Sequence, residues 1–260
     1  MFKILLIPAF KDNYIWLLTR GSRAFVVDPG DAAPVLARLA ADDLVLEGIL
    51  ITHHHADHQG GVAELLARYP AAVFAPVNES ITGCTQPLSG GERIDVLGTS
   101  VEVMAVPGHT LGHLAYHAPG ALFCGDTLFA AGCGRLFEGT PEQMSASLDQ
   151  IANLPDETLI YCAHEYTEAN LRFALAVEPE NEALQQRVVK VAALRAAGQS
   201  SVPSTLADEK ATNPFLRCTE PAVIAAGLRQ SGFQAVSANA SVHHAKSAIF
   251  AMIRSWRNTF

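Results

Sequence analysis

The sequence predicts an α+β protein in which a mixed region of strands and helices is followed by a helical region. Over residues 1 to about 165, short apolar runs of strand length alternate with segments of helical periodicity. Beyond residue 165 the periodic segments are helical only. We therefore expect a first domain over residues 1–165 and a smaller α-helical domain over residues 166–260.

Short apolar runs bounded by turn residues are the predicted strands of the first region. The early runs follow one another through short turns, so we expect largely antiparallel hairpins with the helices outside. One predicted helix, Pro34–Ala41, has Asp31 as a cap just upstream. The predicted strands are Lys3–Ile7, Tyr14–Thr19, Ala24–Val27, Gly48–Ile51, Ala72–Phe74, Val101–Val106, Leu114–His117, Ala121–Cys124 and Thr158–Tyr161, and the other predicted helices are Gly60–Arg68 and Pro141–Asn153.

The second region contains predicted helices separated by clear breaks. Glu178-Pro179 separates the first two helices, and residues 198–204 have the composition of a loop. We expect these helices to form one small unit. They are Thr167–Val177, Glu180–Ala197, Pro221–Gln230 and Ser241–Arg257.

Composition and charge narrow the class of protein. The chain has 260 residues, of which 49% are hydrophobic, and a formal net charge of −8, which argues against a nucleic-acid partner. Five cysteines with no Cys-x-x-Cys pair are typical of a reducing compartment. The first residues lack the layout of a signal peptide, and no apolar stretch is long enough to span a membrane. We therefore expect a cytoplasmic protein with no membrane partner.

The run Thr52–His58 carries four histidines and one aspartate within six residues. It directly follows the predicted strand Gly48–Ile51 and precedes a predicted helix, which argues against a histidine-rich surface loop. Imidazoles and carboxylates are ligands that zinc, iron and manganese accept. Packing so many titratable groups together is unfavourable unless a metal ion organises them.

Alternation along the run predicts which side chains converge. His53 and His55 share one face of an extended segment, so they can bind the same metal ion. Asp57 and His58 follow where the chain turns into a helix, and they can serve a second metal ion. His54 points away from its neighbours, and we expect it to have a structural role or to orient a ligand.

Three further candidate ligands each follow a predicted strand, at positions where sites are commonly built. They are His109, Asp126 and His164. Each alone has an ordinary explanation as a turn or surface residue, but together they should lie on one edge of the sheets. His113 is expected to support the site without binding metal, and His117 lies in a strand with no argument for a site.

These positions provide seven candidate ligands, too many for one four-coordinate zinc ion. They suit two metal ions that share one carboxylate and a water or hydroxide. Asp126 is the natural bridge, because three histidines then serve one metal ion and the remaining ligands serve the other. The first set is His53, His55 and His109, and the second set is Asp57, His58 and His164.

These motifs strongly resemble the metallo-β-lactamase superfamily, with its patterns Thr-His-x-His-x-Asp-His, Gly-His-Thr and Gly-Asp and its late histidine. Within the superfamily, the chain is similar to the glyoxalase II family of hydroxyacylglutathione hydrolases along nearly its whole length. The loop after the Gly-Asp pair and the Asn-Pro-Phe-Leu-Arg segment point to this glutathione-thioester branch. The segments that carry the resemblance are Phe10–Tyr14, Val27–Gly30, Gly132–Thr140, Ala163–Thr167 and Asn213–Arg217.

The resemblance implies an αββα metallo-β-lactamase-type sandwich that carries the metals, with a C-terminal α-helical domain that closes over the substrate. It implies a monomer that hydrolyses S-D-lactoylglutathione, and related 2-hydroxyacylglutathiones, to D-lactate and glutathione in methylglyoxal detoxification. Two divalent metal ions are the implied cofactors. Zinc is expected first, although nitrogen and oxygen ligands also accept iron and manganese.

By the same resemblance, Arg135, Phe137, Tyr166 and Arg217 match positions that hold the glutathione moiety. Arginine suits this role because it binds carboxylates through paired hydrogen bonds. Some family members carry Lys at position 135, Tyr at position 137 and a further Lys shortly after position 217, where this chain has Cys218–Glu220. We expect these departures to affect substrate affinity more than catalysis.

The expected mechanism is metal-assisted hydrolysis, with Asp57 and Asp126 as the catalytic carboxylates. A hydroxide that bridges the two metals attacks the thioester carbonyl while a metal polarises the carbonyl oxygen. Asp57 holds the hydroxide through its free oxygen, and the glutathione thiolate leaves without strong acid assistance because its pKa is about 8.5. Asp28 is expected to orient a metal ligand or to cap the turn at Pro29-Gly30.

Three other functions fit parts of the sequence. A lactone or β-lactam hydrolase of the same fold would not need Arg217, and a lactamase would favour secretion. A mononuclear iron oxygenase acting on a glutathione persulfide would use histidines of the first set and Asp126, leaving the second metal site unused. A metal-binding module without catalysis is the third. Metal content separates the first two classes, because two equivalents favour the hydrolase and one favours the oxygenase.

Overall fold

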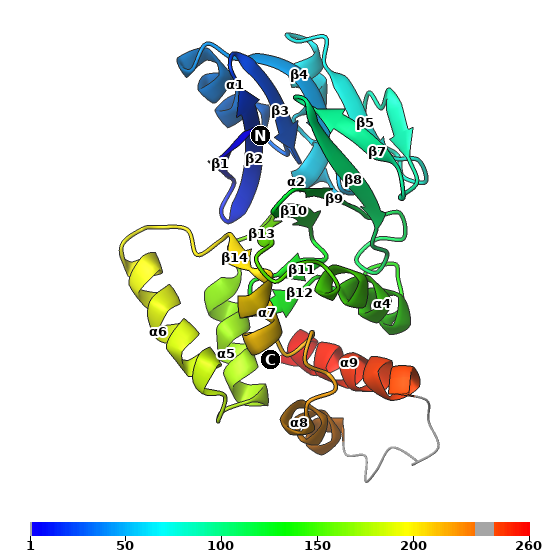
Figure 1. Ribbon diagram of the computed structural model, residues 1–260, viewed down its shortest axis with the longest axis vertical. Coiled ribbons are helices and arrows are strands. Elements are labelled where there is room, and N and C mark those ends of the chain that lie inside the picture. Colours follow the sequence, from blue (N-terminus) through cyan, green and yellow to red (C-terminus); the bar gives the residue numbers. More distant parts are fainter. Residues whose placement is uncertain (1, 232–241) are drawn as a thin grey trace.

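The computed structural model describes residues 2–231 and 242–260 and contains two six-stranded sheets (Figure 1). Apolar side chains from both sheets meet in one hydrophobic cluster, so the sheets lie face to face. The arrangement buries one face of each sheet away from water, which is the main favourable term in folding.

The first sheet begins with an antiparallel meander and continues with parallel strands. Its strands, in order, are β1 (Lys3–Ala9), β2 (Asn13–Arg20), β3 (Arg23–Val27), β4 (Val45–Leu50), β5 (Ala72–Pro76) and β6 (Gln86–Leu88). The first three strands pair antiparallel, whereas β3 to β6 pair parallel. The expected antiparallel arrangement is therefore wrong for the second half of this sheet. Helix α1 (Ala32–Ala41) crosses over from β3 to β4 and returns the chain in the same direction.

The second sheet is mainly antiparallel and receives one strand from the C-terminal region. Its strands, in order, are β14 (Ser204–Thr205), β13 (Leu159–Cys162), β10 (Ala121–Gly125), β9 (Leu114–Ala118), β8 (Thr99–Ala105) and β7 (Arg93–Val96). Helix α4 (Pro141–Ala152) connects the parallel strands β10 and β13. A short hairpin pairs β11 (Leu128–Phe129) with β12 (Gly132–Cys133). The sequence does not predict β6, β7, β11, β12 or β14, because runs of two to four residues carry too little alternation.

Alternation along β2 shows what covers each face of the first sheet. Trp16 and Leu18 belong to the cluster between the sheets, whereas Ile15 and Leu17 belong to a second cluster. That second cluster also contains apolar side chains of α1 and α3 (Val62–Leu66). Helices α1 and α3 therefore cover the outer face of the first sheet.

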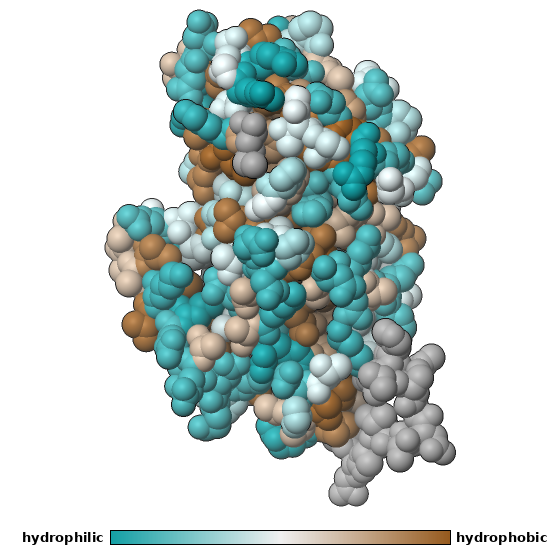
Figure 2. Space-filling view, viewed as in Figure 1, coloured by the Kyte–Doolittle hydropathy of each residue, from teal (hydrophilic) through white to brown (hydrophobic). Residues whose placement is uncertain are grey.

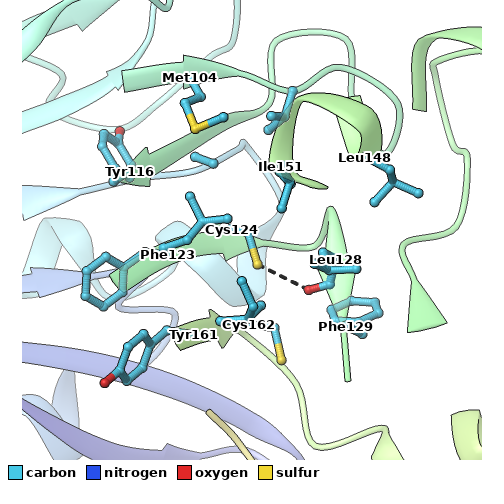
Figure 3. Close-up of a cluster of buried hydrophobic side chains, with 14 of the residues drawn as sticks. Met104, Tyr116, Phe123, Cys124, Leu128, Phe129, Leu148, Ile151, Tyr161 and Cys162 are labelled. Carbon is cyan, nitrogen blue, oxygen red and sulfur yellow. Dashed lines mark hydrogen bonds between the residues drawn. The ribbon is translucent and has the colours of Figure 1, made fainter. Parts of the chain in front are cut away.

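Helix α4 covers the outer face of the second sheet. Figure 3 shows Ile151 of this helix beside Cys124 of β10, and Leu148 on the same helix. The helix begins with a capping box, in which the Thr140 hydroxyl accepts from the Gln143 amide and the Gln143 side chain accepts from the Thr140 amide. Burial of each such leucine or isoleucine contributes about 1.5–3 kcal/mol. The succession of helix, sheet, sheet and helix confirms the predicted αββα sandwich.

The histidine run leads into two short helices, where the sequence predicts one helix over Gly60–Arg68. Helix α2 (Ala56–Gln59) and helix α3 are separated at Gly60-Gly61. A Cβ on Gly61 would lie 2.5 Å from the amide nitrogen of Ala32, so this close approach to the start of α1 requires glycine. The predicted cap of α1 is confirmed, because the Asp31 carboxylate accepts from the Ala33 amide at 2.9 Å.

The C-terminal region packs its helices against the second sheet. Phe173, Phe215 and Phe250 belong to the same hydrophobic cluster as the apolar side chains of that sheet. Because the region shares this core and adds β14, the division at residue 165 stays a prediction. The predicted helix Ser241–Arg257 begins at a residue outside the described part of the chain. The helices are α5 (Thr167–Val177), α6 (Glu182–Ala196), α7 (Leu206–Thr212), which the sequence does not predict, α8 (Pro221–Ser231) and α9 (Val242–Thr259).

Hydrophilic side chains cover much of the face shown in Figure 2, including the part formed by the helical region. Within residues 2–231 and 242–260, no helix combines the length and the hydropathy that crossing a bilayer requires. The large apolar side chains lie mainly between the layers described above.

Candidate metal centre

The seven candidate ligands lie in loops, and in one short helix, at the ends of strands from both sheets. Strand β4 leads into the histidine run, and β8, β10 and β13 lead into the segments that carry the other ligands. Contacts between ring nitrogens and carboxylate oxygens join all seven side chains. The structure therefore brings together His53, His55, Asp57, His58, His109, Asp126 and His164.

We call His53, His55 and His109 the first cluster. Nδ1 of His55 lies 2.9 Å from Nε2 of His53 and 3.1 Å from Nε2 of His109. Nδ1 of His109 lies 2.8 Å from the carbonyl oxygen of Arg135, so Nδ1 carries the proton and Nε2 presents its lone pair to the cluster. Burial and the neighbouring imidazoles lower the pKa of all three histidines. Neutral imidazole is the form that binds a metal ion.

We call Asp57, His58 and His164 the second cluster. Oδ2 of Asp57 lies 3.5 Å from Nε2 of His58 and 3.4 Å from Nε2 of His164. Burial alone would lower the pKa of both histidines, but the surrounding carboxylates raise it, for His164 to about 10. Burial would likewise raise the pKa of Asp57, but the hydrogen bond to His164 and the charge of His58 hold it well below its usual range.

Asp126 lies between the two clusters. Its Oδ2 is 3.4 Å from Nε2 of His109 in the first cluster. Its Oδ1 is 3.5 Å from Nε2 of His58 and 3.3 Å from Nε2 of His164 in the second cluster. Burial by itself would raise the pKa of this carboxyl, but the charges of His58 and His164 hold it well below its usual range. One ionised carboxylate thus offers one oxygen to each cluster.

Two buried atoms of the centre lack a hydrogen-bond partner among the described residues: Nε2 of His58 and Oδ1 of Asp126. Leaving such an atom unpaired is unfavourable by about 1–3 kcal/mol. The separations of 3.3–3.5 Å around Asp126 are longer than hydrogen bonds. Ligand atoms placed about 2.1 Å from a tetrahedral ion lie about 3.4 Å apart. The donor set and its spacing therefore fit divalent metal ions.

Asp28 holds His58 and the start of the histidine run. Its Oδ1 accepts from the Thr52 amide at 2.8 Å, and its Oδ2 accepts from the Thr52 hydroxyl at 2.8 Å. The same Oδ2 lies 3.0 Å from Nδ1 of His58. The Nδ1 proton of His58 therefore points to Asp28, which leaves Nε2 to face Asp126. These contacts favour an orienting role over a turn cap.

Asp12 and Asn13 also contact the second cluster, although the sequence analysis assigns them no role. Oδ1 of Asp12 lies 3.2 Å from Nδ1 of His164, and the Asn13 amide group donates to Oδ2 of Asp57 at 3.0 Å. The amide of Glu165 donates to the carbonyl oxygen of Asp12 at 2.9 Å, which ties this turn to the end of β13. The only signal in the sequence is a polar pair in a turn within the segment Phe10–Tyr14.

Other histidines lie near the ligands without joining them. Nε2 of His113 accepts from the Asp126 amide at 3.2 Å, and its ring stacks on that of His53 at 4.6 Å. His54 points away from the clusters, and its Nδ1 lies 3.1 Å from Oε2 of Glu79. His117 lies in β9, where it pairs with β8 and β10.

Three of the four predicted substrate contacts lie at the rim of the metal centre. Phe137 is 59% exposed and meets the rings of His55 and His109 edge-on, at centroid distances of 5.5 Å and 5.2 Å. The guanidinium of Arg135 lies 5.4 Å from the centre of the Phe137 ring. Tyr166 stacks on His164 at 4.7 Å, and burial with nearby carboxylates raises the pKa of its hydroxyl.

The structure does not bring Arg217 to the metal centre. Its Nε and Nη2 donate to the two carboxylate oxygens of Glu178 at 2.8 Å and 3.0 Å. Its Nη1 donates to the carbonyl oxygen of Lys210 at 3.1 Å. Glu178 is almost fully buried, so this paired hydrogen bond holds Arg217 against α5 and α7.

Solved structures of the metallo-β-lactamase superfamily share this architecture. The structure of ETHE1 from Myxococcus xanthus aligns with a TM-score of 0.64 at 24% identity and covers 98% of this chain and 99% of that chain. That similarity shows the fold alone. The structure of TTHA1623 in a di-iron-bound form aligns with a TM-score of 0.53 at 28% identity and covers 61% of this chain and 90% of that chain.

Sequence families match the two regions separately. The family described as "Metallo-beta-lactamase superfamily" matches residues 10–164, and that described as "Hydroxyacylglutathione hydrolase C-terminus" matches residues 165–260. A protein named hydroxyacylglutathione hydrolase from Dechloromonas aromatica (strain RCB) is 76% identical over 265 residues and covers 100% of both chains. The chain therefore belongs to the hydroxyacylglutathione hydrolase (glyoxalase II) family of enzymes, within the metallo-beta-lactamase superfamily.

Proposed function

We propose that this enzyme hydrolyses S-D-lactoylglutathione, and related 2-hydroxyacylglutathiones, to D-lactate and glutathione with the help of two divalent metal ions. The observation that carries the proposal is the pair of ligand clusters that share Asp126. The name of the relative from Dechloromonas aromatica supports the substrate class. In this function the enzyme would take part in methylglyoxal detoxification.

The residues divide the work of this reaction. The first cluster and the second cluster would each hold one metal ion, with Asp126 shared between them. Two bound divalent ions would supply an activated water for attack on the thioester carbonyl and stabilise the negative charge that develops on its oxygen. Asn13 fixes Oδ2 of Asp57, which keeps this carboxylate turned toward the centre. A thiolate with a pKa of about 8.5 needs little proton donation to leave.

The exposed rim is the proposed contact surface for the glutathione moiety. Phe137 and Tyr166 each pack against a histidine of one cluster, so a substrate that touches them reaches both metal sites. Arg135 adds a positive charge to the rim, which suits the carboxylates of glutathione. Arg217 also stays in the proposal, but it could reach a carboxylate only through donors that its pairing with Glu178 leaves free.

Zinc is the proposed metal, with iron or manganese as alternatives. The first cluster offers three imidazoles and one carboxylate, and the second offers two of each with Asp126 included. Such mixed nitrogen and oxygen sets accept all three metals, so ligand type alone does not choose among them. The di-iron form of TTHA1623 supports a two-metal centre in a protein of related sequence.

The convergence of the second cluster favours a hydrolase over the mononuclear oxygenase. A single iron would leave Asp57, His58 and His164 without a function, although Asp12, Asn13 and Asp28 hold them in place. We further propose a cytoplasmic monomer without a nucleic-acid partner. The net charge of −8 and five cysteines that all stand as free thiols support this part of the proposal.

The test is thiol release from S-D-lactoylglutathione, combined with metal analysis of the same preparation. We expect rapid release that a chelator abolishes and that zinc restores, from a protein with two metal equivalents per chain. Absence of release from a protein that holds two metal equivalents would contradict the thioesterase and favour a lactone or other ester. One equivalent of iron, with oxygen consumed, would favour the oxygenase.

A further inference from the structure

A polar cluster outside the metal centre lies directly beside the first cluster of ligands. Glu79 stands in the loop between β5 and β6, and only 4% of its side chain is exposed. Its Oε1 accepts from the Thr110 hydroxyl at 2.5 Å and from the Gly112 amide at 3.0 Å. Its Oε2 lies 3.1 Å from Nδ1 of His54. A single carboxylate therefore contacts two separate loops.

Both of these loops carry ligands of the first cluster. His54 stands between His53 and His55, and Thr110 directly follows His109. The contact between the loops at the cluster itself is the 3.1 Å approach of His55 to His109. Glu79 thus spans, from behind, the same gap that the ligands span at the front.

Glu138 adds a second link between the same loops. Its Oε2 accepts from the Leu111 amide at 2.9 Å, and its Oε1 lies 3.4 Å from Nε2 of His54. His54 therefore has one carboxylate at each ring nitrogen. Glu138 is 35% exposed, whereas Glu79 is nearly buried, so the stronger constraint comes from Glu79.

The spacing of His54, Glu79 and Glu138 would suit a third metal ion, but the contacts favour a brace. Both oxygens of Glu79 already face a donor group. A Cβ on Gly112 would lie 2.6 Å from Cγ and 2.9 Å from Oε1 of Glu79, so the carboxylate is packed tightly against this loop. The close approach explains why the loop has glycine at this position.

We propose that Glu79 is a positioning residue that sets the spacing of the two loops and thereby the affinity of the first cluster for its metal ion. The proposal rests on the proposed function only in that the first cluster holds a metal. Residues behind metal ligands commonly change metal affinity by about 10–100-fold when they are removed. Glu79 differs from an ordinary partner of a ligand because it bonds to neighbours of three ligands and to no ligand itself.

The experiment measures metal binding by the full chain after removal of its metals. Zinc affinity is determined by competition with a chromogenic chelator, and cobalt(II) absorbance reports the geometry of each site. His55→Ala, which removes a ligand of the first cluster, identifies the equivalent that belongs to it. We expect Glu79→Ala to weaken that same equivalent by about 10–100-fold and to alter its cobalt spectrum, with the other equivalent unchanged.

Two further variants sharpen the test. Glu79→Gln keeps one oxygen for Thr110 and Gly112, so we expect it to restore most of the affinity. Thr110→Val removes a single donor, so we expect a smaller loss at the same equivalent. Glu92→Ala is the matched control, because Glu92 accepts from the amides of Ser89 and Gly90 at 2.7 Å in a loop that carries no candidate ligand.

The proposal is wrong if Glu79→Ala keeps the affinity and cobalt spectrum of both equivalents. It is also wrong if both equivalents weaken equally, since that result marks a general loss of structure. If Glu79→Ala does not fold, Thr110→Val decides by the same criteria. A parent protein that binds two metals but releases no thiol would overturn the proposed function alone, because metal affinity is measured without substrate.

Discussion

The first and second clusters use similar side chains but differ in how their charge is balanced. The first cluster consists of three imidazoles, and burial lowers their pKa values. The second cluster includes Asp57 and is backed by Asp12 and Asp28, so the pKa values of its histidines are raised. Buried charge is stable only where an opposite charge lies close. The comparison indicates that the second cluster is prepared for a cation in the free protein, whereas the first depends on geometry.

The largest effect is expected at the residue that belongs to both clusters. Asp126→Asn removes the charge that faces His109 on one side and His164 on the other. We expect kcat to fall by more than about 100-fold, because even residues behind metal ligands change activity by about 10–100-fold. Metal analysis should show that both equivalents are weakened. The control is Asp95→Asn, whose carboxylate caps a surface turn at Gly98.

If Asp126→Asn weakened only one equivalent, the two clusters would not share this carboxylate. The comparison would then be between two independent sites.

A smaller loss is expected when a partner of the second cluster is removed. Asn13→Ala takes away the donor to Oδ2 of Asp57 and leaves the ligand itself in place. We expect kcat to fall by about 10–100-fold with little change in KM, and the second equivalent to weaken selectively. Steady-state kinetics and zinc competition measure the two effects. Asn153→Ala, at the C-terminal end of α4, should leave both unchanged.

The opposite pKa shifts predict opposite pH dependences for the stability of the metal-free protein. His53 has a lowered pKa, so it must bind a proton on unfolding once the pH falls below about 6.5. Each such histidine removes up to about 1.4 kcal/mol of stability per pH unit below that value. The pKa of His164 is raised to about 10, so its contribution is fully present below about pH 6.5 and is lost as the pH rises toward 10.

Urea denaturation of the metal-free protein between pH 5 and pH 10 separates the two contributions. His53→Gln should flatten the acid limb of the stability profile, and His164→Gln should flatten the alkaline limb. Each variant serves as the control for the other. The charge comparison fails if both variants alter the same limb.

The smallest effect is expected at the exposed rim. Arg135→Ala should raise KM by about 2–5-fold with kcat unchanged, because an exposed charge pair contributes about 0.2–1 kcal/mol. Arg217→Ala should raise KM and also lower the melting temperature, since it leaves the buried Glu178 without its partner. Kinetics with S-D-lactoylglutathione and thermal unfolding check both. A lower melting temperature with KM unchanged would assign Arg217 a purely structural role.

The parallel half of the first sheet shows why local pattern was not sufficient for topology. Apolar runs identify β3, β4 and β5, but the direction of pairing depends on the path of α1 and α3 between them. Alternation is the same in a parallel and an antiparallel strand that is buried on both faces. The direction of these strands therefore could not be read from the runs themselves.

The sequence by itself determined which residues are candidate ligands, because the histidine run and the strand-end histidines and aspartate are local patterns. It also determined the helical region and the family. Only the tertiary structure decided that Asp12 meets His164, 152 residues away, that Glu79 joins two ligand loops, and that Arg217 pairs with Glu178. These contacts join segments whose approach depends on the packing of both sheets, and no local pattern encodes that packing.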